Sequence, residues 1–586
     1  MKKLARYLHD YRKECVLGPL FKLLEALFEL FVPLVIANMV DQGIPAGESG
    51  SLVRGALLLA LLAFIGLAAS VTAQYFAAKA AIGFSTNLRH AVFSHIHTLS
   101  YADLDRLGSS TLVTRLTGDI NQVQTGVNLG LRLLLRSPFV VFGALIMAFL
   151  IDARISLIFL AVIVILFIIV FGIILGAMPG QKKVREDTDH VTSVTRENLS
   201  GVRVIRAFRR EESEKNRFDA LNAVLTKSQL RVGWLTSALN PLTYVVLNLG
   251  IVFLMRSGAL RVDAGTLTQG QVVALYNYMT QILVELVKLA NLIVTLTKSA
   301  ACANRVSSVL EVSSTQADGD RELPGGAVSA LEFRDVSISY HSSGDAALEH
   351  ISFSARAGQT IGVIGGTGSG KSTLVNLIPR FYDATSGEIL VNGMDIRQLK
   401  LSSLRSAIGV VPQKASLFAG TIRSNLLWGN PAAADEDLWQ ALTLAQAAEI
   451  VHGKPDGLDE KVQQNGRNFS GGQKQRLTIA RALTRRPSVL ILDDSASALD
   501  YATDAALRKA LRGIPDPPLT FVVSQRTSSV RHADLILVLD DGLCVGQGTH
   551  EELLRSCPVY QEIHASQSDN EEKPKAHHSG EVSFNG

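Results

Sequence analysis

Apolar residues gather in six long stretches in the first half of the chain. They fall near residues 15–40, 52–80, 131–152, 155–178, 233–256 and 268–298. Each is long enough to cross a hydrocarbon core of about 30 Å, which takes about 20 helical residues. The stretch 155–178 contains no charged residue, and a helix that is apolar all round over such a length is typical of lipid surroundings. The first stretch exceeds the apolar region of a signal peptide and carries Glu25 and Glu29, so it is interpreted as a retained span. The pattern predicts six membrane-spanning helices.

Basic residues in the connecting segments predict the orientation of these helices. The opening segment, the segment after the second span and the segment after the fourth are rich in Lys and Arg, whereas residues 41–50 and 152–154 hold few. Arg256 and Arg261 weaken the contrast in the last outer loop. Because cytoplasmic loops carry the excess of basic residues, we expect a multi-pass protein of the cell membrane with both termini in the cytoplasm. The long inner loops, 83–130 and 179–232, are expected to continue the spans as helices and to bend near Gly108 and Gly201.

The second half of the chain has a different pattern. From about residue 330, short β-branched runs alternate with helical stretches and glycine-rich turns, as in an α/β domain. We therefore expect a membrane domain over 1–312, a polar linker over 313–329, an α/β domain over 330–566 and a disordered polar tail over 567–586. The predicted fold class so far is an α-helical membrane domain with six transmembrane helices, followed by an α/β domain.

Composition adds mainly exclusions. The 586 residues are 47% hydrophobic and 19% charged, so disorder is excluded for most of the chain. A net charge of +4 over this length gives no indication of a nucleic-acid surface. The four cysteines lie far apart in the sequence, which predicts neither a disulfide framework nor a zinc site.

A glycine-rich loop predicts a phosphate-binding site. The strand predicted over 360–364 runs into a segment that fits Gly-x4-Gly-Lys-Ser, and a helical stretch follows. In such a loop backbone N–H groups close round phosphates, and the helix N-terminus adds its dipole. The predicted ATP-binding residues here are Gly365, Gly366, Thr367, Gly368, Ser369, Gly370, Lys371, Ser372 and Thr373. Lys371 would meet the β and γ phosphates, and the Ser372 hydroxyl would ligate Mg²⁺.

A second motif predicts the other side of the same site. The apolar run 489–492 ends in Asp493, and a carboxylate at the end of a strand is suited to orient Mg²⁺ beside the phosphates. The two motifs support each other, because the first would bind the phosphates and the second would orient the Mg²⁺ beside them. The α/β domain is therefore predicted to be an α/β P-loop ATPase domain.

Between these motifs lies Asn-Phe-Ser-Gly-Gly-Gln at 468–473. This region closely resembles the nucleotide-binding domain of ATP-binding cassette transporters, and the six spans resemble the transmembrane half of the exporter type. The resemblance covers nearly the whole chain, with the motifs in the family's order. It implies that Tyr340 stacks on adenine, that Gln413 links the γ-phosphate, Mg²⁺ and the membrane domain, and that 497–500 is the D-loop. It also implies that the bends near Gly108 and Gly201 are coupling helices, one docking on this chain's cassette and the other on the partner's.

Two positions depart from the family pattern. Asp494 stands where members that hydrolyse ATP well have a glutamate as general base, and Gln525 stands where a switch histidine is expected. The segment 462–467 also lacks the glutamate that family members usually have there, which contacts the coupling loops. In the family, cassettes pair head to tail, so a signature completes the ATP site of the opposite chain. Here the signature Ser470, Gly471, Gly472 and Gln473 is intact, apart from Phe469 in place of leucine just before it. The resemblance therefore places the chain as the degenerate-site subunit of a bacterial, multidrug-resistance-like heterodimeric exporter, paired with a different half-transporter.

The cargo and the direction of transport are left open by the sequence. The leading hypothesis is ATP-driven export of amphipathic or drug-like compounds, a class that includes lipids and peptides. Alternatives are a regulatory or channel-like subunit and an importer of the same fold. A soluble ATPase acting on nucleic acid is disfavoured by the six spans. Glu25 and Glu29 could line a cavity for amphipathic cations, or they could lie near the cytoplasmic surface and pair with Lys22 and with each other.

Overall fold

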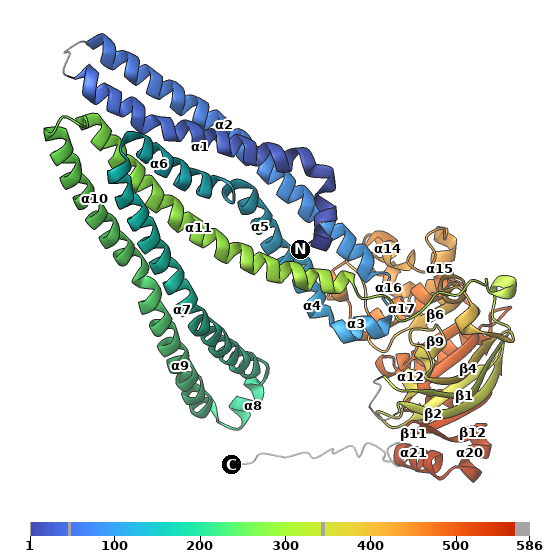
Figure 1. Ribbon diagram of the computed structural model, residues 1–586. Helices are drawn as coiled ribbons and strands as arrows, with labels where there is room; N and C mark the ends of the chain where they lie inside the picture. Colours follow the sequence, from blue (N-terminus) through green and yellow to red (C-terminus); the bar gives the residue numbers. More distant parts are fainter. Residues whose placement is uncertain (1, 45–48, 341–345, 569–586) are drawn as a thin grey trace, which may run out of the picture. The chain divides into compact units, whose positions relative to one another are not determined.

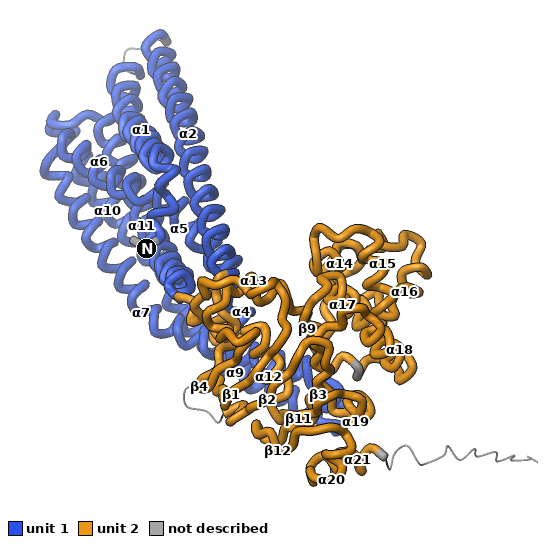
Figure 2. The backbone as a smooth tube through the Cα atoms, turned by 90° about the vertical axis from the view of Figure 1, so that its right-hand side faces the viewer, with its two compact units in different colours: residues 1–97, 108–312 blue, residues 98–107, 313–586 orange. Residues whose placement is uncertain are grey.

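The computed structural model describes residues 2–44, 49–340 and 346–568. They form two compact units, which Figure 2 shows in blue and orange. The helical unit comprises residues 1–97 and 108–312, and the sheet unit comprises residues 98–107 together with the chain from 313 onward. A short segment from the first half of the chain, 98–107, thus belongs to the sheet unit.

Long helices build the helical unit (Figure 1). The long ones are α1 (Arg12–Asn38), α2 (Ser49–Ile96), α5 (Ile120–Leu133), α6 (Arg136–Ile151), α7 (Ala153–Ser200), α9 (Glu211–Ser237), α10 (Leu239–Asp263) and α11 (Gln269–Leu310). The short ones are η1 (Lys2–Tyr11), η2 (Met39–Gly43), α4 (Ser109–Thr114), η3 (Arg115–Asp119) and α8 (Val202–Ala207).

The helical unit contains the predicted spans. Among the described residues, five helical stretches are long and apolar enough to cross a membrane: 50–96, 109–151, 153–200, 211–263 and 269–310. Helix α1 lies at the remaining predicted span and, at 27 residues, is about 40 Å long at 1.5 Å per residue. It is not among these five stretches, so its crossing of the membrane stays a prediction. Large apolar side chains such as Phe64 and Leu150 are 71% and 77% exposed, as expected of faces whose solvent is lipid.

Helices α2 and α7 continue beyond the predicted spans 52–80 and 155–178, as predicted. Helices α2 and α7 have 48 residues each, about 72 Å, which is more than twice the thickness of a hydrocarbon core. The predicted bends are present. Gly108, with φ of 75°, separates α3 (Tyr101–Leu107) from α4, and Gly201 separates α7 from α8.

A twisted sheet of ten strands forms the centre of the sheet unit, in the order β5-β4-β1-β2-β12-β11-β3-β10-β9-β6. The strands are β1 (Ala330–Ile338), β2 (Leu348–Arg356), β3 (Thr360–Gly365), β4 (Ser386–Val391), β5 (Met394–Asp395), β6 (Ile408–Val411), β9 (Val489–Asp493), β10 (Leu519–Ser524), β11 (Leu535–Asp540) and β12 (Leu543–Gly548). A two-stranded sheet pairs β7 (Gly420–Thr421) with β8 (Lys461–Val462). Strands β11, β3, β10, β9 and β6 run parallel.

Helices pack around this sheet, and their apolar faces complete its core. They are α12 (Lys371–Leu377), α13 (Leu401–Ser406), α14 (Ile422–Leu426), α15 (Asp435–Leu444), α16 (Ala448–His452), α17 (Gly471–Thr484), α18 (Tyr501–Arg512), α19 (Thr527–Val530), α20 (His550–Ser556) and α21 (Pro558–Ser568). Helix α21 includes Gln567 and Ser568, which the sequence placed at the start of a disordered tail. The rest of that tail, 569–586, lies outside the described residues.

Candidate nucleotide-binding site

The parallel strands bring the predicted nucleotide residues to one edge of the sheet. In register, β10 pairs with β3 on one side and with β9 on the other, so the carboxyl ends of all three strands lie together. The phosphate loop follows β3, Asp494 follows β9 and Gln525 follows β10. They line a cavity of about 390 Å³ together with Tyr340, Lys371, Ser372, Thr373, Gln413 and Asp493.

The phosphate loop has the backbone that its glycines permit. Gly368 and Gly370 have φ of 86° and 93°, a region that other residues rarely adopt. A Cβ on Gly370 would also lie 2.7 Å from the carbonyl oxygen of Ala347. The amine of Lys371 donates to the carbonyl oxygens of Gly365, at 3.0 Å, and Gly366, at 2.5 Å. It therefore lies inside the loop, where phosphate oxygens would bind.

The charges of the cavity suit a magnesium nucleotide. Burial lowers the pKa of Lys371, and the nearby Asp494 and Asp493 oppose this effect. Burial raises the pKa of Asp493, whose Oδ1 accepts a hydrogen bond of 3.1 Å from the Ser372 hydroxyl. A hydroxyl and a carboxylate side by side at the phosphate loop are oxygen ligands of the kind that Mg²⁺ prefers in addition to phosphate and water. These two residues fit a magnesium ion.

The two departures from the family pattern lie in this cavity. Asp494 has φ of 45°, a conformation that aspartate tolerates better than most residues do. Its N–H donates to the carbonyl oxygen of Val523 at 3.0 Å, and its Oδ2 accepts from Nε2 of Gln413 at 3.3 Å. Gln413, which the resemblance implies as a ligand of Mg²⁺, is thus hydrogen-bonded to Asp494 here. Gln525 lines the cavity beside Asp493 and Asp494.

Tyr340 lies at the rim of the cavity. Its side chain is 45% exposed, and its hydroxyl donates to Thr373 Oγ1 at 3.1 Å. The ring meets Tyr382 edge to face, with centroids 5.0 Å apart. The ring is thus partly exposed and tethered to the phosphate loop, and its stacking on adenine stays a prediction.

The signature residues lie away from this cavity, at the start of α17. Ser470 and Gln473 form a capping box: the Ser470 hydroxyl accepts from the backbone N–H of Gln473, and the Gln473 side chain accepts from that of Ser470. Ser470 and Gly471 are exposed, and none of the four signature residues lines this chain's own cavity. A capped, exposed helix start is available to the phosphates of another chain.

Helix α3 docks on the sheet unit beside the nucleotide cavity. The ring of Tyr101 lies 4.6 Å from that of Phe381, and the Tyr382 hydroxyl donates to Asp105 Oδ2 at 2.6 Å. The segment 380–383 begins three residues after the end of the phosphate-loop helix α12. This contact agrees with the expectation that one bend docks on this chain's own cassette.

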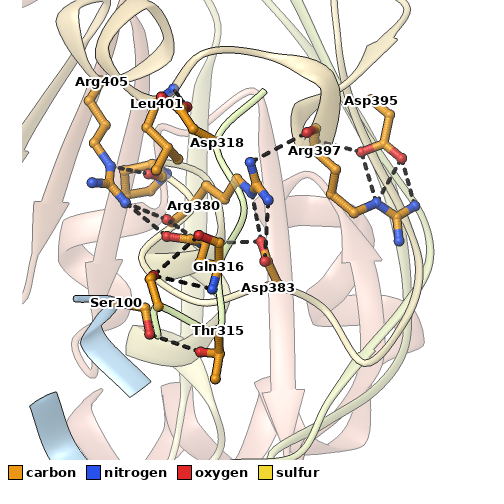
Figure 3. Close-up of polar contacts among 12 residues, drawn as sticks. Ser100, Thr315, Gln316, Asp318, Arg380, Asp383, Asp395, Arg397, Leu401 and Arg405 are labelled. Carbon is orange, nitrogen blue, oxygen red and sulfur yellow. Dashed lines mark hydrogen bonds and ion pairs between the residues drawn. The ribbon is translucent and has the colours of Figure 1, made fainter. Parts of the chain in front are cut away.

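The linker binds the same segment. Figure 3 shows Gln316 between Arg380, Asp383 and Arg405, and Thr315 beside Ser100. Gln316 donates to the Arg380 carbonyl oxygen at 3.1 Å and to Asp383 Oδ1 at 3.2 Å. The residues after α12 therefore hold both α3 and the start of the linker.

The candidate cargo residues take part in ion pairs within the helical unit. The amine of Lys22 lies 2.5 Å from Glu25 Oε2, and the guanidinium of Arg136 lies 2.6 Å from Glu29 Oε2 and 2.5 Å from Glu285 Oε1. Lys22 was the partner expected for Glu25. Sequence analysis missed Arg136, although a charge within a predicted span was the available signal. Its side chain is only 7% exposed. The arrangement favours the structural interpretation of Glu25 and Glu29 over the cation cavity.

Comparison with protein families matches residues 15–286 to the family described as ABC transporter transmembrane region and residues 348–497 to the family described as ABC transporter. An uncharacterized ABC transporter ATP-binding protein of Mycobacterium tuberculosis is 37% identical over 571 residues, which cover 96% of this chain and 98% of the relative. The chain belongs to the ABC transporter family. YfiB of Bacillus subtilis, another uncharacterized ABC transporter ATP-binding protein, is 34% identical over 97% of this chain and 98% of its own length.

Two further proteins resemble this ABC transporter chain over nearly its whole length. An ATP-dependent lipid A-core flippase of Vibrio vulnificus is 29% identical over 97% of each chain. The structure of a bacterial Atm1-family ABC exporter with ATP bound shares the fold with a TM-score of 0.79 and 24% identity, over 95% of this chain and 99% of the other. The chain is therefore an exporter-type half-transporter, with one membrane domain and one ATP-hydrolysing domain, and a half-transporter works as a dimer.

Proposed function

We propose that this chain is the slow-site half of a heterodimeric exporter. It resides in the cell membrane with its ATPase domain and both termini in the cytoplasm. The observation that carries the proposal is the combination of Asp494 and Gln525 in its own cavity with an intact signature for the other site.

The chemistry of its own site favours binding over turnover. Hydrolysis needs a base within hydrogen-bonding reach of the attacking water. Aspartate is one methylene shorter than glutamate, so the Asp494 carboxylate falls short of that water by roughly 1 Å, and a displacement of that size can cost about a hundredfold in rate. Gln525 can donate a hydrogen bond to the γ-phosphate, but it can neither become charged nor move a proton.

Binding, in contrast, is supported by residues that match the family pattern. Lys371 and the loop N–H groups bind phosphate, and Tyr340 offers its ring to adenine. When bound, Mg²⁺ would neutralise charge between the phosphates, held by Ser372 and Asp493. ATP is therefore expected to stay in this site while the other site turns over.

The partner supplies what this chain lacks. A fast site needs glutamate and histidine from the partner, opposed by Ser470, Gly471, Gly472 and Gln473 of this chain. Two copies of this chain would put Asp494 and Gln525 in both sites, and no site would have a well-placed base. The functional unit is therefore one copy of this chain and one different half-transporter.

The proposed cargo is an amphipathic or drug-like compound, with lipids and peptides included. A relative named as a lipid A-core flippase supports an amphipathic cargo. The paired state of Glu25 and Glu29 gives no support for a preference for cations.

ATPase activity with and without the partner tests this proposal. The chain purified alone should be nearly inactive, and co-expression with a half-transporter that bears the catalytic glutamate and the switch histidine should restore activity. Sustained ATPase activity from a homodimer would refute it. ATP-dependent uptake of a fluorescent amphiphile into inverted vesicles, against a gradient, separates export from a gated pore, which would only equilibrate the dye.

A further inference from the structure

The last described helix, α21, reaches the loop that carries Gln525. The side-chain amide of Gln567 bridges two points of this loop: Nε2 donates to the carbonyl oxygen of Gln525 at 2.7 Å, and Oε1 accepts from the backbone N–H of Thr527 at 2.8 Å. The Thr527 hydroxyl also donates to Oε1, at 3.0 Å. One side chain thus holds both ends of the turn between β10 and α19.

The backbone of this turn needs a partner from elsewhere in the chain, because the residues of the turn supply few hydrogen-bonding partners of their own. Gln525 lies one residue beyond β10, where the ladder to β3 has ended at Ser524. Helix α19 has only four residues, and the side chain of its N-cap residue, Arg526, makes no capping hydrogen bond. Unpaired N–H groups at a helix start are satisfied by side chains or water. Here the partner comes from 40 residues along the chain.

Helix α21, which carries Gln567, is anchored to the sheet unit by a buried residue. Tyr560 is fully buried, and its hydroxyl lies 2.8 Å from His550 Nδ1. Residues seven apart lie on the same face of a helix, so Gln567 lies on the face that Tyr560 anchors. Gln561, one residue along from that anchor, instead donates to the carbonyl oxygen of Leu554 at 2.7 Å. The same helix therefore presents one glutamine to the loop and one away from it.

We propose that Gln567 is a positioning residue for the nucleotide site. It fixes the backbone of Gln525 so that the Gln525 side chain faces the cavity, and retention of nucleotide in this chain's own site depends on that contact. The proposal rests on the proposed function, because it assumes a site that holds nucleotide while the other turns over.

The test uses the assembled transporter, co-purified with its partner. Radiolabelled 8-azido-ATP is bound, chased with unlabelled ATP and photo-cross-linked at intervals, and the label is counted separately on each chain's band. Gln567→Met keeps the length of the side chain without its hydrogen bonds, and Gln561→Met is the matched control. We expect Gln567→Met to speed the loss of label from this chain about three- to tenfold, as expected when hydrogen bonds of modest net strength are lost. The control and the partner's band should be unchanged.

The outcomes separate the two claims. Unchanged release from Gln567→Met, with retention intact in the wild type, would overturn the positioning role alone. Loss of assembly in Gln567→Met but not in Gln561→Met would also overturn it, because it would show a structural role. Equally fast loss of label from both wild-type chains would refute the proposed function and the inference with it.

Discussion

Placing the family's usual residues at positions 494 and 525 should convert the slow ATP site into one that hydrolyses ATP. The change is Asp494→Glu together with Gln525→His. The added methylene moves the carboxylate by roughly 1 Å toward the attacking water. Histidine adds a group that can carry charge next to the γ-phosphate. The phosphate loop, Ser372 and Asp493 are left as they are, so the change acts on turnover and not on binding.

The structure limits how far these substitutions can raise ATP turnover at this site. A displacement of roughly 1 Å is worth about a hundredfold, or about 2.7 kcal/mol at 1.36 kcal/mol for each factor of ten. Position 494 has φ of 45°, where a glutamate costs about 1–2 kcal/mol, and relaxation of that strain can displace the carboxylate again. We therefore expect Asp494→Glu alone to raise turnover at this site by between about tenfold and about a hundredfold, and Gln525→His to raise it further.

The assay is ATP hydrolysis in a transporter whose partner has its catalytic glutamate replaced by glutamine, so that the remaining activity reports this chain's site. Asp335→Glu is a matched control, since Asp335 has a similar φ of 51° and does not line this cavity. It adds the same methylene under the same backbone strain, away from the catalytic position, and should leave activity unchanged. If the double variant stays at the wild-type rate, the explanation of the slow site by Asp494 and Gln525 is wrong.

Three other substitutions test separate parts of the structure. Lys371→Ala removes the cation of the phosphate loop and should lower nucleotide occupancy of this chain in photolabelling, with transport impaired; normal labelling would contradict its role. Arg136→Met leaves the buried Glu285 with Lys288 and the Ser137 hydroxyl as its remaining partners, so it should destabilise the protein by up to about 3 kcal/mol, less than a buried charge left with no partner would cost, measured as thermal unfolding in detergent; adding Glu285→Gln should recover part of the loss, and an unchanged midpoint would show that the ion pairs of Arg136 contribute little to stability. Tyr382→Phe removes the hydrogen bond to Asp105 and should lower transport more than ATPase activity, because α3 loses a contact with the nucleotide-binding domain; equal loss of both would argue against a coupling role.

The general architecture could be predicted because it rests on local patterns. Continuous apolar stretches predict spans, and glycines at 108 and 201 marked the bends that the structure contains. The phosphate loop and Asp493 were predicted from strand ends and glycine spacing, and parallel pairing through β10 brings them to one edge.

The contacts that escaped prediction join residues far apart in the sequence. Arg136 bonds to Glu29 and Glu285, 107 and 149 residues away, and no local pattern links them. Gln567 was assigned to a disordered tail because its surroundings are polar. Its place is set instead by the buried face of α21 and by a loop 42 residues earlier.

The most direct test of the account is the chemical state of the nucleotide on each chain during turnover. The wild-type heterodimer is loaded with γ-labelled and α-labelled 8-azido-ATP in parallel, turned over for many cycles, cross-linked and separated into its two chains. The account predicts that this chain retains uncleaved ATP while the partner chain carries mainly ADP. ADP accumulating on this chain as fast as on its partner would contradict it.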